Sequence, residues 1–187
     1  MTIKERKLRG TYEITLSPHE DPRGFFMRTY DKKVFEASGI ARDWVQENES
    51  FSRDKGTIRG LHFQRSPHAE GKLMRVVSGE AFVVWVDIRK GSRTLGAWDG
   101  FTLSSQKKNA VYIPRGFANG LCTLSENCML LYKMDNYYAS EAQDAIVWND
   151  PDIGIVWPVK EPAVMSEKDA NAQSFKEFID RYSGLNE

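Results

Sequence analysis

The sequence predicts a mainly β protein, built as a β-sandwich, jelly roll or barrel with a few peripheral helices. Short segments rich in Val, Phe, Trp and Tyr recur between residues 73 and 138, separated by turn-forming residues. Aromatic residues make up 12% of the chain, and frequent Gly and Pro divide it into many brief segments rather than a few long helices. At 187 residues the chain has the size of a single domain, which we expect to span 1–187.

The β-rich segments follow one another at roughly regular spacing. Segment 73–89 contains two strand-like runs that break at Ser78 and Gly79, which predicts a β-hairpin. Further strands are predicted within 96–105, 109–125 and 127–138, with turns at 114–116 and 125–127. Several short antiparallel strands at this spacing are typical of a sandwich or a barrel.

Two helices are predicted at the edge of this β structure. The first covers 31–40 and closes at Gly39. The second covers about 166–185, begins with Ser166 as its N-cap and ends near Gly184.

Charge and cysteine content limit the partners that the chain can have. Lys and Arg total 26 and Asp and Glu total 26, so the chain carries no overall charge that would attract a nucleic acid. No apolar run reaches the roughly 18 residues of a membrane span. Cys122 and Cys128 lie in an apolar stretch, and the first ten residues have no apolar signal region. We expect a cytoplasmic protein with no nucleic-acid or membrane partner.

His62 is the first candidate for chemistry. In the strand-like segment 57–64, alternation places His62 on the same face as Gln64, where the two would line a polar pocket inside a barrel. A catalytic base, a metal ligand and a histidine with a purely structural role all fit this position. The metal interpretation is the weakest, because His62 has no HxH neighbour and Asn119 follows the turn where a third histidine would be needed.

Other polar residues are ambiguous when each is taken alone. Arg23 and Arg59 stand beside glycines and could hold a phosphate, although an ion pair with a carboxylate is equally consistent. Lys72 could be a solvated strand residue, Tyr132 a buried aromatic, and Asp169 a first-turn helix carboxylate. Residue type and spacing leave these alternatives open.

Taken together, several segments resemble one protein family. They are, in order, DPRGFF, WVQENESFS, KGTIRGLHFQ, PHAEGKLMRVVSGE, VDIRKGSRTLGAW, YIPRGFANG, YKMDNYY, WNDPDIGIVWP and SEKDA, between about residues 21 and 170. This series is similar to the nucleotide-sugar 3,5-epimerases typified by dTDP-4-dehydrorhamnose 3,5-epimerase. The resemblance implies a cupin-type jelly roll, a nucleotide-sugar substrate, no metal and no cofactor. It also implies a homodimer that exchanges N-terminal strands.

The resemblance assigns acid–base roles to four positions. His62 matches the base that removes a proton beside the sugar ketone, and Asp169 matches the carboxylate that orients it. Tyr132 matches the acid on the opposite face, and Lys72 matches the group that stabilises the enolate oxygen. A carbon acid needs a base whose pKa lies near the working pH and a cation or donor for the developing oxyanion, which histidine and lysine provide.

The resemblance also implies a set of substrate-binding residues. They are Arg23, Phe26, Arg28, Gln46, Asn48, Arg59, Asn119 and Tyr138. Two of them depart from the family pattern, since Asn119 stands where a pocket histidine is common and Arg28 where a glutamate is common. These departures leave the sugar and the nucleobase open. Trp85 is a third departure, and it could face either the pocket or the core.

The leading hypothesis is an epimerase that inverts C3, C5 or both in a nucleotide-linked 4-keto-6-deoxy sugar. A dTDP-linked hexose is the default substrate, and a CDP- or GDP-linked sugar, including a heptose, is the alternative. A ketoisomerase, a non-catalytic nucleotide-sugar binding protein and a metal-dependent cupin oxygenase are the rival classes. The filled acid–base set argues against the binding protein, and the single His62 argues against the ketoisomerase.

Overall fold

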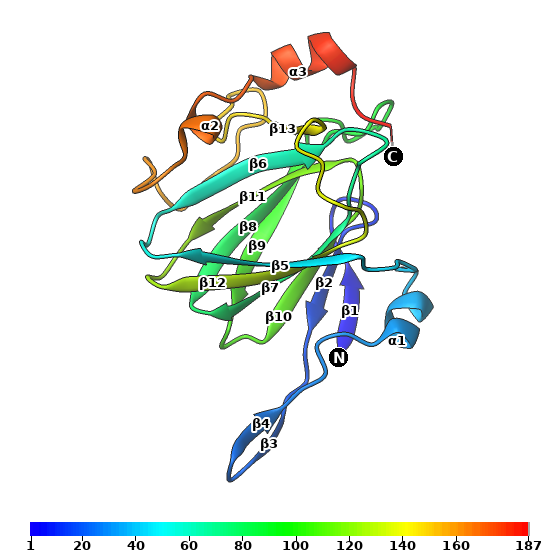
Figure 1. Ribbon diagram of the computed structural model, residues 1–187, viewed down its shortest axis with the longest axis vertical. Coiled ribbons are helices and arrows are strands. Elements are labelled where there is room, and N and C mark those ends of the chain that lie inside the picture. Colours follow the sequence, from blue (N-terminus) through cyan, green and yellow to red (C-terminus); the bar gives the residue numbers. More distant parts are fainter. Residues whose placement is uncertain (187) are drawn as a thin grey trace.

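The computed structural model describes residues 1–186 and consists chiefly of two antiparallel β-sheets that pack face to face (Figure 1). The six-stranded sheet contains, in spatial order, β1 (Thr2–Glu5), β2 (Tyr12–Thr15), β10 (Asn109–Ile113), β7 (Lys72–Ser78), β12 (Cys128–Met134) and β5 (Gln46–Ser52). The five-stranded sheet contains β13 (Gln143–Ala145), β6 (Ile58–Gln64), β11 (Phe117–Thr123), β8 (Glu80–Asp87) and β9 (Trp98–Ser104). The predicted mainly β fold is therefore confirmed.

The hairpin predicted at Ser78 and Gly79 is wrong, although the turn itself is present. β7 ends at Ser78 and β8 begins at Glu80, but the two strands belong to different sheets. β7 pairs with β10 and β12, whereas β8 pairs with β9 and β11. The turns after β10 and β11 also carry the chain from one sheet to the other. A local turn pattern shows where a chain reverses, but burial of both sheet faces decides which strand becomes its neighbour.

The space between the sheets is filled by hydrophobic side chains from both of them. Trp85 is fully buried there, with its ring 5.7 Å from that of Phe101 in an edge-on contact. Its neighbours in this core include Leu103, Val111 and Leu130. Trp85 therefore belongs to the core and is not among the residues that line the cavities beside His62.

The helices lie outside the sheets, as predicted, and the first has the expected ends. In α1 (Lys32–Ala37) the Asp31 side chain accepts hydrogen bonds from the first turn, and Gly39 follows with φ +84°. Phe35 is the buried residue of α1 and packs against Ile14 and Leu16. Among residues 1–186, no helix is long and apolar enough to cross a membrane.

The single C-terminal helix predicted over 166–185 is in fact two short helices, α2 (Glu167–Ala170) and α3 (Phe175–Tyr182). Ser166 caps α2 as expected. Ser174 then starts α3, because its hydroxyl accepts from the Glu177 N–H while the Glu177 carboxylate accepts from the Ser174 N–H. This second N-cap within the predicted segment, a capping box, is the local reason for the break.

Replacing Ser174 with alanine is expected to lower the free energy of unfolding by about 1 kcal/mol, because the first turn of α3 loses its cap. Urea denaturation of the variant and of the unchanged chain measures the difference. Ser140→Ala, at an exposed serine outside the helices, is the matched control. Equal midpoints for Ser174→Ala and the unchanged chain would contradict the assignment of this cap.

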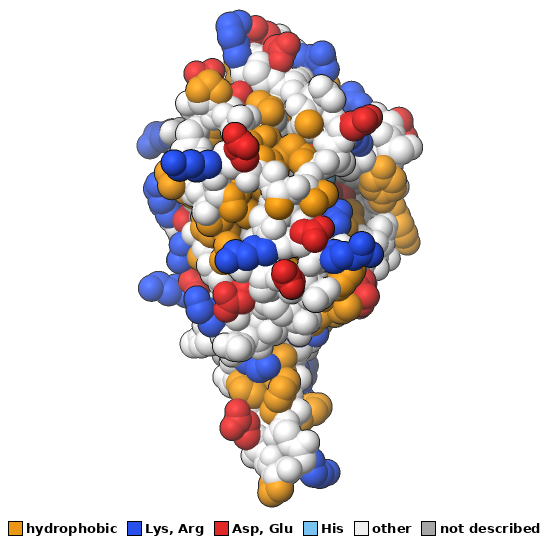
Figure 2. Space-filling view, turned by 90° about the vertical axis from the view of Figure 1, so that its left-hand side faces the viewer, with side chains coloured by type: hydrophobic (Ala, Val, Ile, Leu, Met, Phe, Trp, Pro, Cys, Tyr) orange, Lys and Arg blue, Asp and Glu red, His pale blue; other side chains and the backbone are white. Residues whose placement is uncertain are grey.

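One hairpin projects away from the two sheets. β3 (His19–Asp21) pairs with β4 (Gly24–Phe26), and the pair extends below the body of the protein in Figure 1. Figure 2 shows the same projection with hydrophobic side chains on its surface. Phe25 and Phe26 are 52% and 70% exposed. Aromatic side chains this exposed on a slender hairpin mark it as a surface suited to contact another molecule.

Candidate active site

A cavity of about 350 Å³ opens between the two sheets beside His62. We call it the His62 cavity, and it is lined by Gln46, Asn48, Glu49, His62, Phe63, Gln64, Glu70, Lys72, Tyr132, Met134, Tyr138 and Gln143. β5, β7 and β12 of the six-stranded sheet form one wall, and β6 and β13 of the five-stranded sheet form the other. His62 and Tyr132 therefore come from opposite walls.

A second cavity of about 390 Å³ shares His62 and Gln143 with the first. We call it the Arg59 cavity, and it is lined by Thr57, Ile58, Arg59, His62, Gln143, Val164, Met165, Ser166, Lys168 and Asp169. The guanidinium of Arg59 donates to the Ser52 hydroxyl at 3.0 Å and to the Phe51 carbonyl at 3.0 Å. These bonds hold a positive group beside His62, where an anionic part of a substrate could be bound.

His62 is held by Asp169, which lies 107 residues further along the chain. The distance from His62 Nε2 to Asp169 Oδ1 is 2.6 Å, and the other Asp169 oxygen accepts from the Gly60 N–H at 3.0 Å. When Nε2–H donates to Asp169, Nδ1 is left as the nitrogen that can accept a proton. The pair can therefore work as an oriented general base.

Gly60 is required for this arrangement. Its backbone has φ +106°, and a Cβ at this position would lie 2.5 Å from the Asn119 carbonyl oxygen. A larger residue would move β6 away from β11 and displace the backbone N–H of residue 60 that donates to Asp169.

Burial alone would raise the pKa of the Asp169 carboxyl, but the hydrogen bonds from His62 and Gly60 hold it below its ordinary value. The carboxylate therefore stabilises the fold above the ordinary Asp pKa of about 4, and this contribution is lost as the pH falls through the lowered value. We expect Asp169→Asn to cost about 1–3 kcal/mol of unfolding free energy near pH 7. Its deficit should shrink below about pH 4.

Urea denaturation between pH 3 and pH 7 tests this expectation. Asp180→Asn is the control, because Asp180 forms an exposed ion pair with Lys176. A deficit for Asp169→Asn that stays constant across the whole pH range would contradict a lowered pKa for Asp169.

Lys72 and Asn119 connect His62 on one wall with Tyr132 on the other. The Lys72 ammonium lies 2.9 Å from Glu70 Oε1, 3.4 Å from Asn119 Oδ1 and 5.8 Å from the centre of the Tyr132 ring. The Asn119 amide also donates to the His62 carbonyl at 3.1 Å. Asn119 thus fixes the His62 backbone and offers its oxygen to Lys72.

Tyr132 faces the cavity from β12. Burial raises the pKa of its phenol above the ordinary value, and the negative charge of Glu70 raises it further. The phenol therefore keeps its proton at neutral pH, which suits a proton donor.

The polar side chains near the cavity mouth form a connected group. Gln46 Nε2 donates to Asn48 Oδ1 at 3.1 Å, and Gln46 Oε1 accepts from the Tyr138 N–H at 3.1 Å. The Tyr138 hydroxyl donates to Gln143 Oε1 at 2.8 Å. These contacts place three of the predicted substrate-binding residues at one edge of the His62 cavity.

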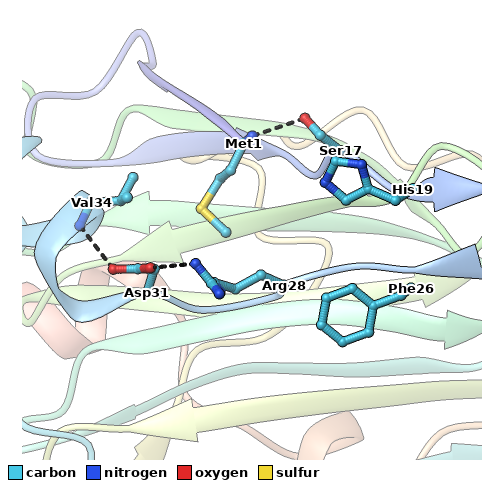
Figure 3. A pocket seen from close by; sticks show the side chains of 7 residues that line it. All are labelled: Met1, Ser17, His19, Phe26, Arg28, Asp31 and Val34. Carbon is cyan, nitrogen blue, oxygen red and sulfur yellow. Dashed lines mark hydrogen bonds and ion pairs between the residues drawn. The ribbon is translucent and has the colours of Figure 1, made fainter.

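The remaining three predicted residues are not brought to the His62 cavity within one chain. Arg23 is on the projecting hairpin, where its side chain is 90% exposed and pairs with Asp21. Phe26 and Arg28 instead line a separate hollow of about 290 Å³ at the base of the hairpin (Figure 3). There Arg28 points toward Asp31, with which it forms an ion pair at 3.0 Å.

Sequence reasoning missed several residues of the site. Glu70, Gln143 and Lys168 line the two cavities but were not among the predicted residues, whereas Gln64 lies in the His62 cavity as strand alternation predicts. Glu70 had a usable signal, because a residue two positions before Lys72 in an extended segment projects to the same side. For Gln143 and Lys168 no local pattern indicated a place beside His62.

A histidine bound to a carboxylate, a phenol on the opposite wall and an ammonium group meet in one sheet sandwich, an arrangement suited to an isomerase that moves protons at carbon beside a carbonyl group. Comparison with known proteins makes the assignment specific. Residues 5–177 match the family described as dTDP-4-dehydrorhamnose 3,5-epimerase, and the chain belongs to this family. The predicted epimerase class and cupin-type jelly roll are confirmed.

Individual relatives cover most of the chain. It is 49% identical over 156 residues to dTDP-4-dehydrorhamnose 3,5-epimerase of Shigella flexneri. The aligned region covers 83% of this chain and 85% of that protein. A solved dTDP-6-deoxy-D-glucose-3,5-epimerase from Legionella pneumophila, in complex with dTDP-4-keto-L-rhamnose, is 40% identical with a TM-score of 0.88, covering 92% of each chain.

A 3′-monoepimerase from Streptomyces bikiniensis is also similar. Its structure in complex with dTDP-quinovose is 27% identical with a TM-score of 0.87, covering 96% of this chain and 90% of that chain. In a solved double mutant of that enzyme, a histidine and a tyrosine 70 residues apart are replaced together. His62 and Tyr132 are separated by the same 70 residues.

Proposed function

We propose that this chain inverts C3 and C5 of a dTDP-linked 4-keto-6-deoxyhexose, the reaction after which its family is named. The observation that carries the proposal is the placement of the His62–Asp169 pair and Tyr132 on opposite walls of one cavity, with Lys72 beside them. A planar enolate between these walls can lose a proton to one side and regain one from the other.

Each inversion takes two proton transfers in this proposal. His62 Nδ1 removes the proton from the carbon beside the ketone, and the electrons of that C–H bond form the enolate. The Lys72 ammonium stabilises the enolate oxygen while Asp169 stabilises the imidazolium. Tyr132 then gives its phenolic proton to the opposite face of the carbon, and solvent exchange returns His62 and Tyr132 to their starting forms.

The neighbouring polar groups fit the rest of a nucleotide sugar. Arg59 supplies a cation in the cavity next to His62, which suits the diphosphate. Gln46, Asn48 and Tyr138 supply hydrogen-bonding groups and an aromatic ring at the mouth of the His62 cavity. Asn119 contacts Lys72 and so belongs to the sugar end of the site in this proposal.

A homodimer completes the proposed site. The β3–β4 hairpin extends away from the two sheets, with Arg23 and Phe26 on it and Arg28 at its base, and in this proposal it enters the mouth of a second copy's cavity. Sedimentation should give twice the 21.4 kDa mass of the chain. Mixing the inactive variants Arg23→Ala and His62→Ala should restore activity, because a mixed dimer contains one intact site. A monomeric mass, or no restoration after verified exchange of subunits, would contradict the shared site.

The substrate is tested by NMR after incubation in deuterated water with dTDP-, CDP- and GDP-linked 4-keto-6-deoxyglucose. Deuterium at both C3 and C5 of the dTDP sugar supports the proposal. Deuterium at C3 alone would instead assign the chain to the 3′-monoepimerase activity named for the Streptomyces bikiniensis relative. No incorporation into any of the three sugars would overturn an epimerase function.

We also propose that the enzyme works in the cytoplasm. Cys122 and Cys128 are both buried as free thiols, and burial raises the pKa of Cys122 to about 11. Unreactive free thiols of this kind suit a reducing compartment.

A further inference from the structure

We infer that Glu70 is a positioning residue of the acid–base site, which holds the Lys72 ammonium beside the Tyr132 ring, where it can stabilise the enolate oxygen. This inference rests on the proposed function. The Glu70 side chain is only 7% exposed and that of Lys72 only 10%, and their ion pair measures 2.9 Å. No role for Glu70 follows from the family resemblance.

The carboxylate of Glu70 is unexpected in a site that must stabilise an enolate. A second negative charge repels the developing oxyanion unless a cation lies between them. Lys72 is that cation, because its ammonium contacts Glu70 and also faces Asn119 and the Tyr132 ring. The ion pair fixes a flexible lysine side chain in one place before the substrate arrives.

Glu70 is itself held from two directions. Its second oxygen accepts from the Gln64 amide, which also donates to the Tyr137 carbonyl at 3.1 Å. Gln64 is buried, and its oxygen accepts from the Ala139 N–H at 2.7 Å. Glu70 is therefore connected through one side chain to the loop that carries Tyr138.

The backbone next to Glu70 is clamped as well. The Gly71 N–H donates to the buried Asp135 carboxylate at 2.6 Å, and the Asp135 N–H donates to the Gly71 carbonyl at 3.2 Å. Arg115 donates to the same carboxylate at 3.2 Å. The backbone between Glu70 and Lys72 is therefore held by Asp135 at the end of β12 and, through it, by Arg115 in the turn at 114–116. These contacts fix the position of the Glu70–Lys72 pair.

The charges around Tyr132 allow a test by pH. Lys72 on β7 and Glu70 just before it face the Tyr132 ring. Arg59 and His62 face it from β6, and Asn48 lies beside it on β5. Burial and Glu70 both raise the pKa of Tyr132, in that order of size, and Arg59 opposes them. Removing the Glu70 charge should therefore lower the pH at which Tyr132 loses its proton.

Glu70→Gln is the decisive variant, because glutamine keeps the shape of the side chain and removes its charge. We expect kcat to fall on the order of 10- to 100-fold, since Lys72 is no longer held in place. KM should change little, and the basic limb of the kcat profile should move to lower pH. A purely structural role for Glu70 would leave that limb where it is.

Two further variants complete the experiment. Glu70→Asp keeps the charge but withdraws it from Lys72, so its kcat should fall while the basic limb stays in place. Glu47→Gln is the matched control, because Glu47 forms a 2.9 Å ion pair with Lys133 whose two side chains are 52% and 29% exposed. It should behave as the unchanged enzyme.

The outcomes are distinguishable. If the unchanged enzyme incorporates no deuterium into any sugar, the proposed function fails and the role of Glu70 fails with it. If the unchanged enzyme is active and Glu70→Gln has the same kcat and pH profile, only the role of Glu70 is overturned. Should Glu70→Gln fail to fold in a circular dichroism test, Glu70→Asp decides, and an unchanged kcat in that variant overturns the inference.

Discussion

Replacing His62 with alanine is expected to abolish deuterium incorporation at both C3 and C5, with kcat lowered by a factor on the order of 10³ or more. His62 is the base in the proposed reaction, and its Nε2 is already bound to Asp169 at 2.6 Å. Without the imidazole, the site keeps a cation and an acid but has no group to remove the first proton. NMR in deuterated water measures the exchange directly.

The loss must come from chemistry and not from unfolding. His62 is partly exposed to the cavity, so the variant should fold, and its melting temperature provides the check. His68→Ala is the matched control, because the His68 side chain is 39% exposed and its ring nitrogen lies 4.0 Å from the Glu141 carboxylate. Exchange at the normal rate in His62→Ala would refute the assignment of the base.

Replacing Tyr132 with phenylalanine is expected to separate exchange from inversion. The variant removes only the phenolic hydroxyl, so His62 can still take a proton and return a deuteron to the same face. Inversion should fall on the order of 100-fold or more, while exchange into recovered substrate falls much less. Coupling constants in the NMR spectrum distinguish labelled substrate from labelled epimer.

A second tyrosine serves as the control for this variant. Tyr182 lies on α3, where its hydroxyl donates to Asp144 at 3.1 Å, and Tyr182→Phe should leave exchange and inversion unchanged. If Tyr132→Phe slows exchange and inversion by the same factor, the phenol acts before or during proton removal, and the proposed division of roles is incorrect.

The elements that sequence reasoning predicted well are those with local causes. Asp31 and Gly39 mark the two ends of α1, since a cap and a left-handed glycine act on their nearest neighbours. The C-terminal helix was misjudged because Ser174 restarts the helix inside one continuous polar and apolar pattern. The Ser78–Gly79 turn was found, but its sheet partners were not.

In the candidate site too, sequence reasoning predicted some residues and missed contacts between distant segments. His62, Lys72, Tyr132 and Asp169 were predicted from a resemblance carried by several motifs, whereas alternation within one strand left His62 ambiguous. The places of Glu70, Gln64 and Asp135 in the network around Lys72 were not predicted. Those contacts join residues from separate segments, and no local spacing records them.

By itself, the sequence determined the mainly β class, the turns, the family and the residues proposed for acid–base chemistry. Only the tertiary structure decided that Asp169 meets His62 across 107 residues of chain, that Tyr132 lies on the opposite wall, and that Lys72 is paired with Glu70. The physical reason is that turns and caps are local interactions, while strand order follows from burying two sheet faces against each other. Strand order in turn decides which distant side chains share a cavity.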